Sequence, residues 1–201
     1  MKRSTLLKVL FVAVLGIALP LPAFASDSNA ESFVKSKHAE LSALLSQPAT
    51  AANEKQIQGV FDRLLDYDSL AKESLHEYWG ERSDAEKKEF RDVLERLVRG
   101  AYRKNLRKTL DYDIEYRGSD KAQQGYLVRT VAKSRSSQRE DPVSIDYLLH
   151  KVDGQWRVYD IVTEGSSLVQ NYRSQFRRVI KKKGFEELMR RMKAKLEKES
   201  A

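Results

Sequence analysis

The sequence predicts an α+β fold in which a twisted antiparallel sheet packs against several helices. Apolar residues recur at helical spacing through residues 26–110 and again through 164–201. Between 111 and 163, apolar and polar residues alternate instead, as they do in half-buried strands. Short polar segments join the expected strands, which favours an antiparallel meander with helices on one face. We expect residues 26–201 to form a single domain, because a chain of this length can build its own core.

Residues 1–25 are typical of a secretory signal peptide. Three basic residues precede an uncharged apolar run at 9–19, and the stretch ends in Ala23-Phe24-Ala25. A basic start, a short apolar centre and an Ala-x-Ala end predict cleavage after Ala25. The run is short for a membrane span, so an uncleaved anchor is the weaker alternative. No second apolar run has spanning length, and we therefore expect a soluble, secreted protein.

Composition narrows the classes of partner and site. The chain has no cysteine, which excludes disulfides, thiolate metal sites and the lipid-modified cysteine of a bacterial lipoprotein. Its three histidines are isolated in sequence and lack metal-ligand spacing, so no metal site is predicted. The net charge is +8, and it falls to +5 without residues 1–25, which hold three basic residues and no acidic one. Secretion argues against nucleic acid as the partner and favours anionic lipid surfaces or acidic proteins.

Capping signals divide the first helical part. Apolar residues at 33–45 recur at helical spacing, and Gln47-Pro48 ends that helix. Asn53 followed by Gln56 predicts the capped start of a second helix. Asp66-Tyr67-Asp68 marks a break and a new cap before a short third helix.

The third helix is expected from Leu70 to Trp79, with Gly80 closing it. Ser83-Asp84-Ala85-Glu86 then forms the clearest capping box in the chain. The helix that follows carries an apolar stripe opposite its charged face, a pattern typical of a helix that packs on a core. The stripe comprises Phe90, Val93, Leu94, Leu97, Val98, Ala101, Tyr102 and Leu106.

Four strands are expected between residues 111 and 163. The first begins near Tyr112 and is followed by a loop from Gly118 to Gly125. The second covers 126–133, the third begins at Val143 and the fourth covers 155–163. An Asp153-Gly154 turn joins the last two, because this dipeptide tolerates the positive φ angles of a tight hairpin.

The fourth strand passes within a few residues into the last helix. Glu164-Gly165 breaks the strand, and Ser167 and Gln170 predict a capped helix start. Asp160 lies in the strand among bulky apolar residues, where an unpaired carboxylate would be costly, so we expect a partner such as Arg173. We interpret Asp160, Gly165 and Ser167 as structural: a buried pair, a turn and a cap.

The last helical segment is strongly basic. It is expected to break at Gly184 and resume at Phe185, and its cations outnumber Glu186 and Glu187. The simpler interpretation is a solvated helix face. The alternative is a surface that docks onto anionic headgroups or a membrane-bound partner.

Two long stretches resemble the toluene-tolerance family, the periplasmic phospholipid-binding proteins of the maintenance-of-lipid-asymmetry pathway in Gram-negative bacteria. One is VDGQWRVYDIVTEGSSLVQNYRSQF at 152–176, and the other is LLDYDSLAKESLHEYWGERSDAEKKEF at 64–90. The resemblance extends from about residue 55 to 192. His76 departs from it, because the family pattern usually has glycine after Leu75.

The resemblance implies an NTF2-like sheet with added helices, and an apolar cavity between sheet and helices. It implies a periplasmic carrier with phospholipid as cargo and no cofactor, which we expect to be a monomer. Such a carrier moves lipid between an outer-membrane lipoprotein–porin complex and an inner-membrane ABC transporter complex, and so maintains the lipid asymmetry of the outer membrane.

Under this resemblance, thirteen residues are candidates for contact with lipid, although most could equally be ordinary core. For Arg173, an alternative role is binding of a lipid phosphate. The candidates are Leu94, Leu97, Val98, Ala101, Ile114, Tyr116, Val128, Ile145, Tyr147, Val158, Tyr172, Arg173 and Phe176.

No catalytic motif is found, and we do not expect an enzyme. There is no Gly-x-Ser-x-Gly nucleophile elbow and no phosphate-cradling glycine loop. Two alternatives to a carrier stay open. One is an isomerase-type enzyme in which Asp160 and a tyrosine abstract a proton beside a carbonyl. The other is a periplasmic interaction module without catalysis.

Overall fold

The computed structural model describes residues 28–137 and 139–200, apart from the side chains of residues 28, 103–106, 199 and 200. The expected signal peptide lies outside the described residues. The helical part before the sheet consists of α1 (Ser28–Leu45), α2 (Ala51–Leu64), α3 (Tyr67–Leu75), the 3-10 turn η1 (His76–Tyr78), α4 (Asp84–Leu106) and the 3-10 turn η2 (Arg107–Asp111). The sheet follows with β1 (Tyr112–Lys121), β2 (Tyr126–Ser134), β3 (Val143–Val152), β4 (Gln155–Thr163) and β5 (Ser166–Ser167), and the described chain ends in α5 (Leu168–Ser200).

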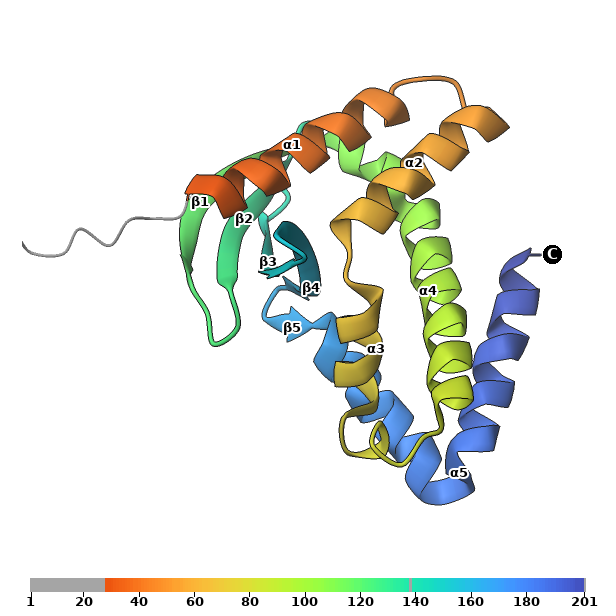
Figure 1. Ribbon diagram of the computed structural model, residues 1–201. Coiled ribbons are helices and arrows are strands. Elements are labelled where there is room, and N and C mark those ends of the chain that lie inside the picture. The colour runs from red at the N-terminus through yellow and green to blue at the C-terminus, as the bar shows by residue number, and fades with distance from the viewer. Residues whose placement is uncertain (1–27, 138, 201) are drawn as a thin grey trace, which may run out of the picture.

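The fold is α+β, as predicted. The five strands lie in the order β1-β2-β3-β4-β5, every neighbouring pair is antiparallel, and the sheet does not close on itself. Helix α1 lies across the sheet, while α2, α3, α4 and α5 gather beside it (Figure 1). The short strand β5 was not expected from sequence, because two residues carry no periodicity.

The expected loop from Gly118 to Gly125 was wrong in its first half. Strand β1 continues to Lys121, and its pairing with β2 shifts register between Tyr116 and Ser119. Gly118 sits in this irregularity with φ +93°, and a glycine there lets one strand take up extra residues without ending the ladder. The true turn is short and ends at Gly125, where a side chain is excluded because an added Cβ would lie 1.9 Å from the backbone oxygen of Leu149.

Of the capping signals before α2, α3 and α4, those of α3 and α4 were confirmed and that of α2 was misplaced. The backbone N–H of Ser83 donates to Glu86 (2.8 Å), and the N–H of Glu86 donates to the Ser83 hydroxyl (3.2 Å), which is the expected capping box. The side chain of Asp66 caps α3 by accepting from the N–H of Ser69 (2.9 Å). At α2, however, the cap is Thr50, whose hydroxyl accepts from the N–H of Asn53 (3.2 Å).

Asn53 has a different task from the predicted one. It is buried, and its amide nitrogen donates to the carbonyls of Leu44 (2.8 Å) and Pro48 (3.1 Å). It therefore ties the connection after α1 to the first turn of α2.

Helix α3 is shorter than expected and ends at Leu75 rather than Trp79. His76 follows at φ +49° and ψ −113°, and its N–H still bonds to the carbonyl of Lys72. This backbone conformation suits glycine far better than a residue with a side chain.

Two other predicted turns were confirmed. Asp153 and Gly154 both have positive φ angles (+50° and +76°), as the two-residue hairpin between β3 and β4 requires. Gly184, at φ +84° and ψ +170°, interrupts α5 and separates it into two helical arms that meet at an angle (Figure 1).

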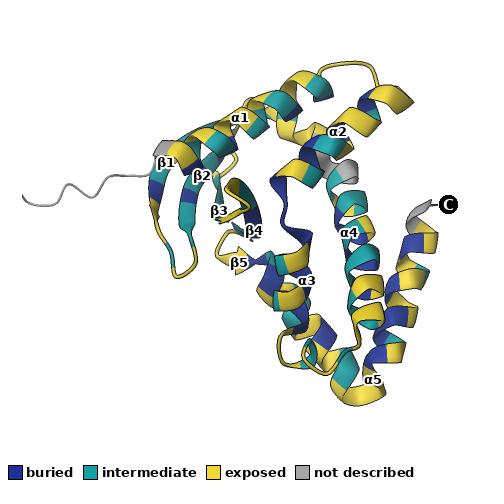
Figure 2. Ribbon diagram, viewed as in Figure 1, coloured by how far each residue is buried: buried dark blue, intermediate teal, exposed yellow. Residues whose placement is uncertain are grey.

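The core lies where the helices meet one another and one end of the sheet (Figure 2). Phe90, Leu94 and Val98 on α4 are at most 1 % exposed, as are Val128 on β2 and Val158 on β4. The rings of Phe176 and Phe185 approach Phe90 at 5.5 and 6.2 Å, so both arms of α5 pack on α4. No helix in the described part of the chain is both long and apolar enough to cross a bilayer.

Candidate functional site

The sheet surface that faces the helices is covered at one end and partly open at the other. Val128, Leu149 and Val158 are fully buried there. The strand register places Ile114, Tyr116, Ile145 and Ile161 on the same face, because Tyr116 and Ile145 both pair with Thr130, Ile161 pairs with Tyr147, and Tyr147 pairs with Val128. These four side chains keep intermediate exposure. An apolar lining that the helices do not fully cover therefore lies on the helix-facing side of the sheet.

His38 joins α1 to this lining. Its Nδ1 lies 2.6 Å from the hydroxyl of Tyr116 and its Nε2 lies 2.9 Å from the hydroxyl of Tyr147. Burial lowers the pKa of His38 to about 4, so the ring is neutral near pH 7, with one nitrogen donating and the other accepting. The arrangement binds α1 to β1 and β3 through one side chain.

Aromatic side chains from α4 and α5 face the same interior. Burial raises the pKa of Tyr147, and the nearby phenol of Tyr102 adds to this effect. Burial also raises the pKa of Tyr102, and the nearby phenol of Tyr172 raises it further. Tyr102 stacks on Phe61 with centroids 5.3 Å apart, and Tyr172 stacks on Phe176 at the same distance. The interior is thus amphipathic: mostly apolar surface with phenolic hydroxyls set into it.

The predicted pairing of Asp160 with Arg173 was wrong. Asp160 is buried, and its Oδ1 accepts from the backbone N–H groups of Ile161 (2.8 Å) and Val169 (3.1 Å), while its Oδ2 accepts from the Ser167 hydroxyl (2.5 Å). The Ser167 hydroxyl in turn accepts from the N–H of Gln170 (3.0 Å). Three donors compensate the buried carboxylate without a cation, because the free N–H groups and the positive end of the dipole at the start of α5 lie beside it.

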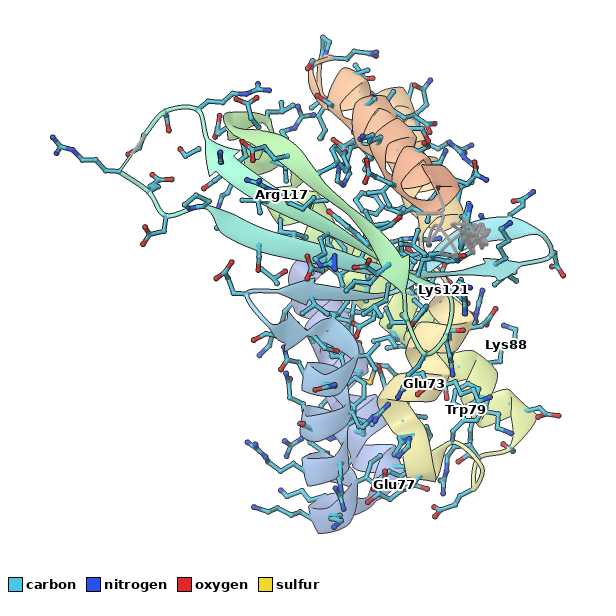
Figure 3. All side chains as sticks on the ribbon, turned by 90° about the vertical axis from the view of Figure 1, so that its left-hand side faces the viewer. Glu73, Glu77, Trp79, Lys88, Arg117 and Lys121 are labelled. Carbon is cyan, nitrogen blue, oxygen red and sulfur yellow. The ribbon has the colours of Figure 1, made fainter. Side chains whose placement is uncertain are left out.

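Arg173 binds α3 instead. Its Nε donates to the backbone carbonyl of Glu73 (2.9 Å) and its terminal nitrogen donates to the Glu73 carboxylate (3.1 Å). One turn further along, Arg177 pairs with Glu77 at 3.1 Å. Glu73 and Glu77 lie on the segment beside α5 (Figure 3). In this conformation two nitrogens of the Arg173 guanidinium bind Glu73 on α3.

Two surface hollows lie elsewhere, along α4. One has a volume of about 650 Å³ between α2, α4 and the second arm of α5, and its lining includes Ile57, Phe61, Leu196, Lys55 and Arg96. The other, about 960 Å³, continues along α4 beside the second arm of α5 and shares Arg96 and Leu196 with the first. Neither hollow lies between the sheet and the helices.

The candidate residues fall into three groups by exposure. Ala101 is exposed, and Ile114, Tyr116, Ile145, Tyr172 and Arg173 are half-buried. The others are buried: Leu94, Leu97, Val98, Val128, Tyr147, Val158 and Phe176. Of the structural residues, Gly165 is exposed in the turn before β5 with φ +73°, and Asp160 and Ser167 are buried. Contact with lipid stays a prediction for each of the thirteen.

His38, Ile161 and the special position of Tyr102 were not predicted from the sequence. Tyr102 was recognised on the α4 stripe but not as part of the lining. His38 was set aside as isolated, although it lies four residues after Val34 and three before Leu41, which places it on the apolar face of α1. That spacing was the available signal. Among the described residues, no three His, Asp or Glu side chains are grouped so that they could hold a metal ion.

Comparison with known proteins agrees with this architecture. The family model described as MlaC protein matches residues 35–194. Among solved structures, the chain is similar to a phospholipid-binding protein from Ralstonia solanacearum, determined in complex with a phospholipid, at 19 % sequence identity and a TM-score of 0.75. The match covers 86 % of this chain and 99 % of the other, and at this identity it shows a shared fold. No match is found among curated proteins. The extent of the family match shows that the chain belongs to the MlaC protein family.

Proposed function

We propose that this protein binds phospholipid and carries it through the periplasm between outer-membrane and inner-membrane complexes. The observation that carries the proposal is the partly exposed apolar lining on the helix-facing side of the sheet, at Ile114, Tyr116, Ile145 and Ile161. Apolar surface left in contact with water is unfavourable, and an acyl chain would cover it. Membership of the MlaC family and the shared fold with a phospholipid-bound protein support the same cargo.

The energetics explain why a carrier is needed. Burial of each methylene is favoured by about 0.8 kcal/mol. Two acyl chains of about 15 methylenes each would therefore gain roughly 24 kcal/mol on leaving water. A free phospholipid therefore does not cross an aqueous compartment at a useful rate. A bilayer offers nearly the same gain as a protein interior, so loading and unloading can be close to balanced. Direction must then come from partner complexes.

The isomerase alternative loses support from the surroundings of Asp160. A general base needs a free lone pair that points at the substrate. Three hydrogen bonds already use most of the acceptor positions of the Asp160 carboxylate, and those from Ser167 and Val169 lie at the start of α5. This geometry supports an architectural role for Asp160 and favours a carrier over that enzyme.

Lipid binding is tested by extracting the protein purified from the periplasm and measuring phospholipid by mass spectrometry. Ile145→Trp should reduce the bound lipid severalfold while the fold survives, because Ile145 is only partly covered and an indole would occupy the open end of the lining. Val131→Trp is the matched control. Val131 is similarly half-buried on β2 but lies on the opposite face of the sheet, since it pairs with Ser144. Lipid-free protein, or equal lipid content in both variants, would contradict the proposal.

Val98→Trp does not serve this purpose, although the position is a lining candidate. Val98 is 1 % exposed, so a larger ring would overpack the core and cost about 1–3 kcal/mol whether or not lipid binds.

The carrying step needs its own assay. Labelled phospholipid should pass from donor vesicles that contain the outer-membrane complex to acceptor vesicles that contain the ABC transporter complex only when the protein is present. Transfer that Ile145→Trp leaves at full rate would separate carriage from the lining and overturn this part of the proposal.

A further inference from the structure

Four basic residues next to the bend of α5 at Gly184 form no ion pair in the described part of the chain. Arg178, Lys181 and Lys182 are exposed, and their i, i+3, i+4 spacing puts them on one face of the first arm of α5. Lys183 follows, and Gly184 turns the chain. We call Arg178, Lys181, Lys182 and Lys183 the basic corner.

Neighbouring cations of α5 differ, because they have acidic partners. Arg173 and Arg177 bind Glu73 and Glu77, and Lys193 binds Glu89. Beyond the bend, the carboxylate of Glu187 forms ion pairs with Arg190 and Arg191 at 2.7 and 2.8 Å. Within the described part of the chain, no ion pair is found for the four residues of the basic corner.

The basic corner also lies at one end of the molecule, away from the sheet. The bend of α5 and the connection from α3 to α4 form the end opposite α1 (Figure 1), and nitrogen-tipped side chains project from this part of α5 into solvent (Figure 3). Two contacts hold the connection there: Arg177 pairs with Glu77, and the guanidinium of Arg82 lies 5.0 Å from the ring centre of Phe185. A flat partner can therefore approach this end without meeting the sheet.

We propose that the basic corner docks the protein on the anionic surface of a phospholipid bilayer. A bilayer requires charge without fixed geometry, and three of the four residues are lysines, which are depleted in protein–protein interfaces. The exposed residues of the first arm before the corner are all polar, namely Gln170, Asn171, Ser174, Gln175 and the paired Arg177, so they supply no apolar anchor of the kind that a protein partner uses. The inference rests on the proposed carrier function, since docking would bring the lipid-binding interior to the membrane that loads or receives lipid.

The test is flotation with vesicles of the protein without the expected signal peptide, because the basic and apolar stretch at 1–25 would itself bind a bilayer. The protein should float with phosphatidylcholine vesicles that contain phosphatidylglycerol and not with phosphatidylcholine alone, and about 1 M NaCl should release it, because the screening length is then about 3 Å. Each cation near an anionic surface strengthens binding about fivefold, so the triple variant Arg178→Gln, Lys181→Gln, Lys182→Gln should bind about 100-fold more weakly.

The matched control removes the same charge elsewhere. Lys108, Lys195 and Lys198 are exposed on η2 and on the last turns of α5, and their triple change to glutamine should leave vesicle binding within about fivefold of the unchanged protein, the effect of a single cation. Equal loss in both triple variants would assign binding to net charge and overturn the proposal. So would failure of the unchanged protein to float, or loss in the corner variant of binding to an acidic partner protein with vesicle binding intact.

Lipid content separates this inference from the carrier function. A corner variant that retains extracted phospholipid but does not float supports docking and leaves carriage standing. Lipid-free protein that still floats through the corner would overturn carriage and leave docking.

Discussion

Arg173 holds α5 to α3 through two separate groups of Glu73, the backbone carbonyl (2.9 Å) and the carboxylate (3.1 Å). The contact crosses a hundred residues of sequence and lies where the strand-to-helix junction leads into α5. It gives the guanidinium a structural role in the contact between α3 and α5.

Arg173→Ala should therefore lower the free energy of unfolding by about 1–2 kcal/mol, measured by urea denaturation. Hydrogen bonds to charged groups contribute about 1.5–3 kcal/mol, and partial exposure of both side chains reduces this. Arg173→Lys is the control that keeps the charge but loses the two-pronged geometry, and it should recover part of the loss. If Arg173→Ala instead loses bound lipid at unchanged stability, Arg173 is a phosphate ligand.

Asp160→Asn should destabilise the protein by about 1–3 kcal/mol, because an amide offers one acceptor oxygen where three donors now converge. Ser167→Ala should cost about 1 kcal/mol as the loss of a helix cap. The double variant should cost less than the sum of the two, since both changes remove the same hydrogen bond. Ser166→Ala, at the exposed neighbouring position, should stay within about 0.5 kcal/mol. Additive effects of Asp160 and Ser167 would show that they do not act together.

The fold could be predicted from the sequence where turns, caps and helix breaks depend on residues close together in the chain. Asp153-Gly154, Ser83 with Glu86, and Gly184 each set a turn, a cap or a break within four residues, and all three were placed correctly. Alternation along 111–163 likewise revealed the strands, because burial of one sheet face imposes a period of two.

The candidate site could be predicted less well, because its side chains contact residues that lie far away in the sequence. His38 meets Tyr116 and Tyr147 across 78 and 109 residues, and no local pattern encodes which hydroxyls a buried imidazole will find. Asp160 was assigned a cation because sequence shows charges but not the direction of backbone N–H groups. The exposure of Ile145 compared with Val128 was also hidden, since both are apolar residues on the same face of the sheet.

His76→Gly should stabilise the protein by about 1 kcal/mol. A side chain at φ +49° and ψ −113° costs about 1–3 kcal/mol, and relief of this strain exceeds the extra entropy that glycine loses on folding, about 0.5–1 kcal/mol. Gly165→Ala is the reciprocal control: no atom lies within 4 Å of the added Cβ, so the expected loss of about 1 kcal/mol comes from φ +73° alone. Thermal and urea unfolding measure both. A destabilised His76→Gly would mean that the histidine side chain makes a compensating contact.

His38 should make stability fall as the pH falls through the weakly acidic range. Its pKa is about 4 when folded against 6.5 when unfolded, so between these values the unfolded chain binds a proton that the folded protein excludes. Unfolding free energy then rises with pH, because its slope follows the excess of protons bound by the unfolded state. The contribution is complete above about pH 7 and absent below about pH 4, and from pH 7 to pH 5 it amounts to a loss of about 2 kcal/mol.

His38→Gln should remove most of this dependence, since an amide can donate and accept between Tyr116 and Tyr147 without titrating. Urea unfolding at pH 7, 6 and 5 measures the slope. His76→Asn is the matched control, because it also removes a histidine but at an exposed position outside the contact between α1 and the sheet, so the slope should stay that of the unchanged protein. A slope that His38→Gln leaves unchanged would place the titrating group elsewhere. The tie from α1 to the sheet through a neutral imidazole would then have no part in acid sensitivity.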